Sequence, residues 1–135
     1  MCSSDLARAL HHFGEVQRVN QAVKILQENS ADAMKNLGKL MNATHRSLRD
    51  FYEVSTPDVN HLISIINEDE NVFGARIIGG GFGGNVLVLT TADNVDALVD
   101  HVQKKYYAPQ LRDGMLEGAI MISTPGDGVS ELTIL

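Results

Sequence analysis

Apolar residues recur at helical spacing at the start of the chain and predict a first helix over residues 6–28. Gly14 interrupts this helix and is a point at which it could divide, and Asn29 and Ser30 end it. Ser30 is also placed to cap a second helix, which continues to Phe51. The short connection predicts an antiparallel helical hairpin. The apolar stripe of the first helix comprises Leu6, Leu10, Phe13, Val16, Val19, Val23 and Leu26.

A third helix is indicated by its start sequence. Thr56 is the expected cap, Pro57 stands at the first helical position, and Asp58 faces the positive end of the helix dipole. A polar turn over residues 67–71 follows. The expected buried face of this helix comprises Val59, Leu62, Ile63 and Ile66.

The second half of the chain has the pattern of strands and a helix. Strands are predicted at residues 77–78 and 86–89, and their unbroken apolar runs indicate that both faces are covered. A fourth helix opens at Asp93 and closes near residues 104–106, and a third strand is predicted over residues 118–123. The order of elements predicts one domain of the α+β class, with helices packed on one face of a small antiparallel sheet.

Composition narrows the functional class. A length of 135 residues with 44% hydrophobic and 21% charged residues suits a single globular domain. The formal net charge of −6 argues against nucleic acid and anionic membranes as partners. Cys2 is the single cysteine, so neither a disulfide framework nor a cysteine-based metal site is expected. No apolar run approaches the roughly 20 residues of a membrane span, and we expect a cytoplasmic protein.

Five glycines fall within six residues between the first two predicted strands, which is more than a hairpin turn needs. One interpretation is a loose hairpin connection or a tight approach between two backbones. The other is a bare cradle whose backbone N–H groups face an anion, most often a phosphate. The candidate nucleotide-binding residues are Gly79, Gly80, Gly81, Phe82, Gly83 and Gly84.

The sequence around these glycines excludes several known phosphate-binding motifs. Gly79, Gly81 and Gly84 fit the dinucleotide pattern, but a strand follows them where that fold requires a helix. No Lys-Ser or Lys-Thr follows for a Walker loop. With Val86 the run fits the glycine loop of protein kinases, whose catalytic signatures this sequence lacks. What remains is a phosphate-associated loop on a hairpin, which needs help from another segment.

Two stretches resemble the GHMP small-molecule kinases in their galactokinase form. Residues 74–84, GARIIGGGFGG, look like the third conserved motif of that family. Residues 40–58 resemble the segment before it, in which a helix ends in Tyr-Glu-Val-Ser and another helix begins. Three residues depart from the galactokinase pattern: Asn85 replaces a usual cysteine, Phe51 a common aspartate and Ile78 a usual threonine.

The resemblance implies that residues 1–135 are a GHMP kinase C-terminal domain of ferredoxin-like fold, with the N-terminal catalytic domain missing. It implies an enzyme that uses ATP and Mg²⁺ to phosphorylate galactose at its anomeric hydroxyl, with no catalytic and no metal-binding residue in this fragment. A domain without its partner is expected to expose apolar surface. Two alternatives stay open: a kinase for another sugar, such as an arabinose or a heptose, and a non-catalytic galactokinase-like regulator.

Three further residues are candidates for lesser roles. His45 is either a packed histidine or a group near the phosphates. Arg76 is expected to pair with phosphate, Glu53 or Asp50, and Glu53 is a candidate support for the glycine loop. The adjacent His11 and His12 point in different directions on a helix, so they do not have metal-ligand spacing.

Overall fold

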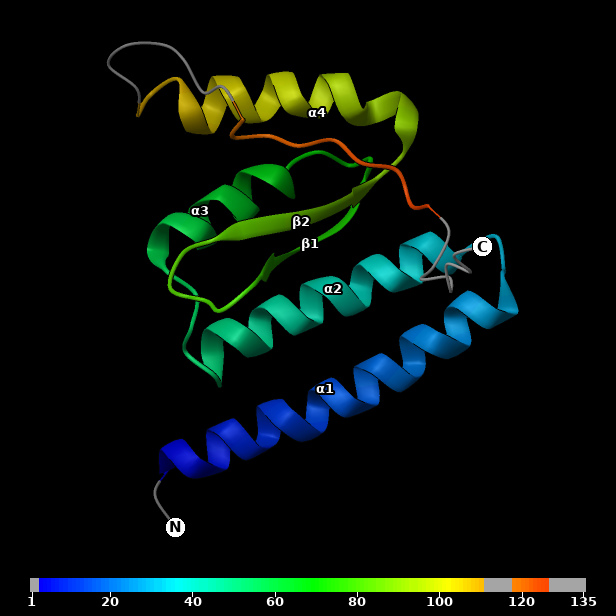
Figure 1. Ribbon diagram of the computed structural model, residues 1–135, viewed down its shortest axis with the longest axis vertical. Helices are drawn as coiled ribbons and strands as arrows, with labels where there is room; N and C mark the ends of the chain where they lie inside the picture. The colour runs from blue at the N-terminus through cyan, green and yellow to red at the C-terminus, as the bar shows by residue number, and fades with distance from the viewer. Residues whose placement is uncertain (1–2, 111–117, 127–135) are drawn as a thin grey trace, which may run out of the picture.

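The computed structural model describes residues 3–110 and 118–126 of the chain, and its elements follow one another in the predicted order (Figure 1). A short 3₁₀ turn, Ala92–Asn94, precedes the fourth helix, and a π-helical turn, Gln103–Tyr107, follows it. The main elements are α1 (Ser3–Glu28), α2 (Ala33–Asp50), α3 (Pro57–Ile66), β1 (Val72–Ile78), β2 (Asn85–Thr90) and α4 (Val95–Val102).

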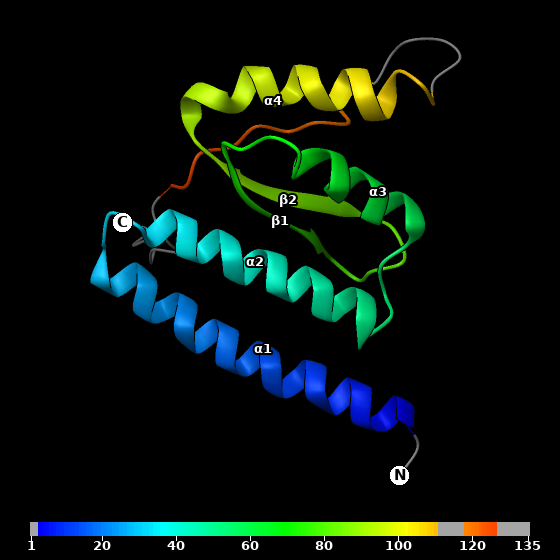
Figure 2. The same cartoon turned by 180° about the vertical axis from the view of Figure 1, so that it is seen from behind.

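The first two helices form the expected antiparallel hairpin at one edge of the molecule (Figures 1 and 2). Helix α1 is continuous through Gly14 and ends at Asn29, whose φ of 44° lies in the left-handed region. The predicted Ser30 cap is wrong. Asp32 occupies the N-cap of α2 without a capping side-chain bond, and Ser30 instead accepts a turn hydrogen bond from the Ala33 amide through its carbonyl.

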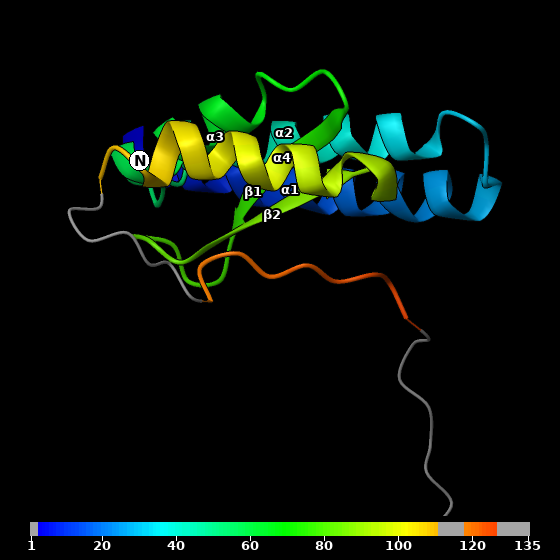
Figure 3. The same cartoon turned by 90° about the horizontal axis from the view of Figure 1, so that it is seen from above.

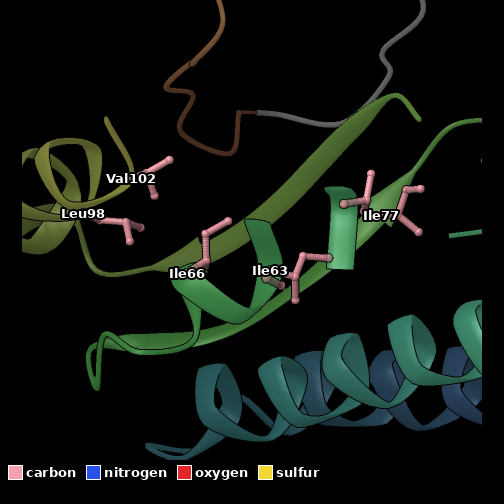
Figure 4. Close-up of a cluster of buried hydrophobic side chains, with 7 residues drawn as sticks. Ile63, Ile66, Ile77, Leu98 and Val102 are labelled. Carbon is pink, nitrogen blue, oxygen red and sulfur yellow. The ribbon is translucent and has the colours of Figure 1, made fainter. Parts of the chain in front are cut away.

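The start of α3 is as predicted. The Thr56 hydroxyl accepts a hydrogen bond from the Val59 amide at 3.3 Å, and Pro57 is the first helical residue. Figure 4 shows the core that this helix builds, in which Ile63 and Ile66 face Ile77 of β1 and the α4 side chains. The remaining core members are Val59, Ala75, Leu98 and Val102.

The two strands pair antiparallel and lie beneath a layer of helices, as Figure 3 shows. Residues 118–123 do not form the predicted third strand, and in the described residues the sheet consists of β1 and β2. Ile120 still packs against the core, but Met121 and Ile122 are 81% and 63% exposed. Ile120 is therefore the contact of this segment with the core, and without a hydrogen-bonded ladder that contact is not sufficient to make a strand.

Helix α2 lies unusually close to strand β1. A Cβ atom added to Gly38 of α2 would lie 2.1 Å from the Phe73 carbonyl oxygen, and one added to Gly74 would lie 2.2 Å from the Gly38 carbonyl oxygen. Just along the helix, Asn42 Oδ1 accepts a hydrogen bond from the Ala75 amide at 2.9 Å. A pair of facing glycines therefore sets the distance between the helix layer and the sheet.

The apolar stripe of α1 is exposed. Its seven members keep between 47% and 68% of their surface accessible, and α2 is the main packing partner of this helix. Leu87 of β2 is also 48% exposed, so the prediction that both faces of this strand are covered is wrong. The apolar surface expected on a domain without its partner lies chiefly on α1. Within the described ranges, no helix combines the length and hydrophobicity that crossing a membrane requires.

The purified chain is expected to self-associate through α1, because burying these side chains removes apolar surface from water. Light scattering over a wide concentration range should give masses above the 14.7 kDa of the monomer. Val19→Lys should reduce the association, whereas Gln17→Lys adds the same charge to an exposed polar position of the helix and should change it less. A monomer at every concentration would contradict this prediction.

Candidate functional site

The candidate loop connects the last residue pair of the hairpin, Ile78 and Asn85. Its path is possible only with glycine at most positions. Gly79, Gly81, Gly83 and Gly84 have φ values of 88°, 82°, 124° and 95°, and Phe82 has a φ of 57°. These angles lie in the region that side chains with a Cβ rarely adopt. A two-residue hairpin turn uses one or two such angles, and this loop has five in six residues.

One side of the loop is fixed to the junction between α2 and α3. The Phe82 amide donates to the Val54 carbonyl oxygen at 2.7 Å, and the Val54 amide donates to the Leu48 carbonyl oxygen at 3.0 Å. A Cβ atom on Gly81 would lie 2.6 Å from Val54 Cβ. Val54 is buried, and Glu53 before it has a φ of 60°. The Tyr-Glu-Val-Ser segment therefore supports the loop through its backbone and through Val54.

The other side of the loop is open. A Cβ atom added to Gly79, Gly80 or Gly83 would meet no heavy atom of the described residues within 4 Å. Phe82 projects from the same loop with 76% of its surface exposed. The structure thus combines a held inner side with bare backbone on the outer side, which is the arrangement that close approach of a phosphate requires.

A charged cluster braces α1 against α2 and β1 below the loop. Glu15 Oε1 accepts hydrogen bonds from Arg18 Nε at 2.6 Å and from the Thr44 hydroxyl at 2.7 Å, and its other oxygen lies 4.0 Å from Arg76. Burial by itself would raise the pKa of Glu15, but the bonds from Thr44 and Arg18 outweigh it and hold the pKa below its usual value. Glu15 therefore stays ionised and ties three elements together.

The candidates for lesser roles have partners that the sequence did not reveal. Arg76 faces Glu15 rather than Glu53 or Asp50, and its Nε donates to the Ile77 carbonyl oxygen at 3.2 Å. The carboxylate of Glu53 lies 3.6 Å from Arg8 and is mostly exposed, so its side chain does not support the loop. The sequence contains no signal that would have selected Glu15 as the partner, because α1 meets β1 only through the tertiary packing.

Two of the candidate histidines are packed inside the protein, His45 fully and His11 in part. His45 is 4% exposed, and burial followed by the nearby Arg49 charge lowers its pKa. Nδ1 of His11 lies 2.9 Å from the Ser47 hydroxyl, and its ring stacks on Tyr52 at 4.8 Å between centroids. Burial lowers the pKa of His11 as well. In residues 3–110 and 118–126, no three His, Cys, Asp or Glu side chains gather in a way that could hold a metal ion.

Comparison with known proteins places this geometry in a family. Residues 6–108 match the family model described as GHMP kinases C terminal. The chain belongs to the GHMP kinase family and corresponds to its C-terminal domain, as an α+β structure with helices on one face of the sheet.

The individual proteins that this chain resembles are galactokinases. It is 37% identical to the galactokinase of Bos taurus over 120 residues, which cover 84% of this chain and 30% of that protein. It is 36% identical to the galactokinase of Fusobacterium nucleatum over 127 residues, or 94% of this chain and 31% of the relative. The chain thus spans about a third of the length of these relatives.

A solved structure agrees with the sequence comparison. The crystal structure of Lactococcus lactis galactokinase complexed with galactose superimposes with a TM-score of 0.72 at 33% sequence identity. The match covers 81% of this chain and 27% of that protein. The similarity in three dimensions therefore extends over most of the helices and the hairpin described above.

Proposed function

We propose that this chain is the C-terminal part of a cytoplasmic sugar kinase of the galactokinase type. The whole enzyme would transfer the γ-phosphoryl group of ATP to the anomeric hydroxyl of galactose. The proposal is supported by the galactokinase relatives and by the glycine loop, which is held by Val54 on one side and open on the other. The loop is the observation that carries the proposed role of this domain.

In this proposal residues Gly79–Gly84 lie beside the phosphates of ATP. Phosphoryl transfer depends mostly on positioning and on stabilising negative charge, so a rigid wall of backbone N–H groups is a useful contribution. The hydrogen bond from Phe82 to Val54 fixes this wall to the end of α2. Glycine allows the phosphate oxygens to approach the backbone without contacting a side chain.

The residues present fit ATP better than they fit a metal ion. The open glycine loop suits phosphate oxygens, whereas the described residues contain no carboxylate cluster for a cation. Mg²⁺ would neutralise charge on the ATP phosphates and be held by them together with groups outside this chain. The catalytic and sugar-binding residues are likewise expected in an N-terminal domain, and the exposed side chains of α1 and Phe82 are available to pack against such a domain.

The chain by itself is expected to show no sugar-kinase activity, because its glycine loop supplies backbone donors without a general base. A chimera in which this chain replaces the C-terminal part of Lactococcus lactis galactokinase should phosphorylate galactose. An ATP-dependent galactose phosphorylation assay of the two proteins tests both expectations. Turnover by the chain alone, lost on mutation of one of its residues, would contradict the first.

A folded chimera that binds galactose but transfers no phosphate would contradict the proposed role of this domain. Galactose and ATP binding to the chimera can be measured separately, so a misassembled interface is distinguished from an inactive one.

A further inference from the structure

A polar depression other than the glycine loop lies on the surface of the protein. It has a volume of about 500 Å³ and is lined by α2, α3 and the turn that leads into β1. Val72 at the start of β1 belongs to its lining, whereas the glycine loop begins after Ile78 at the other end of that strand. The seven residues of β1 put Val72 about 20 Å from the start of the glycine loop, whereas Asn60, on the opposite side of the depression, is bonded to Ser55 beside the loop anchor Val54.

Two asparagines in the lining of this depression carry side-chain NH₂ groups that can donate hydrogen bonds. Asn42 Oδ1 accepts a hydrogen bond from the Ala75 amide at 2.9 Å, and Asn60 Oδ1 accepts one from the Ser55 hydroxyl at 2.8 Å. Both asparagines line the depression. Each oxygen already accepts one hydrogen bond, whereas the two NH₂ groups make none with another described residue and can donate to a ligand. The uncharged side chains that line the depression therefore favour a ligand that accepts hydrogen bonds.

Positive charge lies on the α2 side of the same depression. Arg46 is exposed and makes no hydrogen bond or ion pair with another described residue, whereas Arg49 is bound to Asp50 by two bonds of 2.6 and 3.0 Å. His45, between them on the helix, is 4% exposed, and its Nδ1 has no hydrogen-bond partner in the described part of the chain. Arg46 thus forms no ion pair with a described residue, and the nearby carboxylate of Asp50, which feels its charge, is bound by Arg49.

The carboxylates of the depression are either engaged or at its exposed rim. Asp69 accepts hydrogen bonds from the Asn71 amide and from Asn94 Nδ2, both at 2.9 Å. Glu70 is exposed and makes no ion pair with another described residue. Among the lining groups, Glu70 is therefore the one whose charge opposes the binding of an anion most directly. Removing that charge should strengthen binding, which is the opposite of the effect expected when the charge of Arg46 is removed.

We propose that this depression binds inorganic phosphate or a small phosphate monoester, with Arg46 as the charged contact and Asn42 and Asn60 as neutral donors. Guanidinium and phosphate match in geometry and can form two parallel hydrogen bonds. Bound phosphate would connect α2 to α3 at a distance from the glycine loop. The site would be additional to the nucleotide site proposed above and does not depend on it.

The test is an NMR titration of the 135-residue chain with inorganic phosphate, compared with sodium chloride at equal ionic strength. Saturable shifts are expected for Arg46 Nε–H and for the Asn42 and Asn60 NH₂ groups. A second titration with galactose 1-phosphate distinguishes inorganic phosphate from a phosphate monoester as the preferred ligand. Tighter binding of the ester supports a phosphorylated metabolite, and equal binding supports inorganic phosphate. Shifts that do not saturate, that chloride reproduces, or that are confined to Gly79–Gly84 would overturn the proposal.

Substitutions at exposed positions make the test specific. Arg46→Gln should weaken phosphate binding at least about tenfold. Lys35→Gln removes the same charge from an exposed position on the same helix and should change the affinity less than about twofold, because the charge there is screened. Glu70→Gln should strengthen binding. Equal affinities for the Arg46→Gln and Lys35→Gln variants, with both folded by circular dichroism, would overturn the proposal.

Discussion

Gly80→Val in the active chimera is expected to lower turnover, or to raise the KM for ATP, at least about tenfold, a loss of roughly 1.4 kcal/mol of transition-state stabilisation. Gly80 does not have a left-handed φ, and a Cβ atom there meets no described heavy atom within 4 Å. The valine side chain therefore fits the protein but occupies the space that a phosphate would enter. The melting temperature should remain close to that of the parent.

Gly81→Val provides the comparison. Its φ of 82° and the 2.6 Å approach to Val54 Cβ mean that a side chain strains the loop itself, so both stability and kinetics should fall. Measuring ATP kinetics and melting temperature on the same preparations separates the two effects. Unchanged kinetics for Gly80→Val would show that the glycines serve only as a hairpin turn.

Gly38→Ala is expected to lower the free energy of unfolding by about 2–4 kcal/mol, although alanine is the better helix former. The added methyl group would lie 2.1 Å from the Phe73 carbonyl oxygen. That oxygen belongs to the backbone of β1 and cannot move unless the whole strand moves. Helix and strand must therefore separate, which also loosens the contact between Asn42 and Ala75. Chemical denaturation of the purified chain measures the change.

Gly14→Ala is the matched control, because it makes the same substitution inside α1. There the nearest described heavy atoms belong to the guanidinium of Arg18, at 3.0 Å, which is the end of a flexible side chain. The free energy of unfolding should change by less than about 1 kcal/mol. Equal effects at the two positions would show that helix propensity, rather than the close approach of α2 to β1, governs these glycines.

Local signals in the sequence determined the order of the main elements and some of their ends, although β1 begins at Val72 rather than near Ile77. Thr56 and Pro57 start α3 because a hydroxyl and a proline satisfy the first turn of a helix through short-range contacts. Asn29 ends α1 because it tolerates a left-handed φ. The position of the glycine loop between two strands was also readable, since clustered glycines and flanking apolar runs are local features. The motif around it was sufficient to indicate the family.

Other features followed from the tertiary structure alone, because they join residues far apart in the sequence. Val54 as the anchor of Phe82, Glu15 as the partner of Arg76, and the facing pair Gly38 and Gly74 each depend on how α2 and β1 pack. Spacing along one helix cannot identify what its apolar stripe meets, and on α1 that stripe is exposed. The apolar run at residues 118–123 has strand character, but a strand also needs a pairing partner, which propensity does not supply.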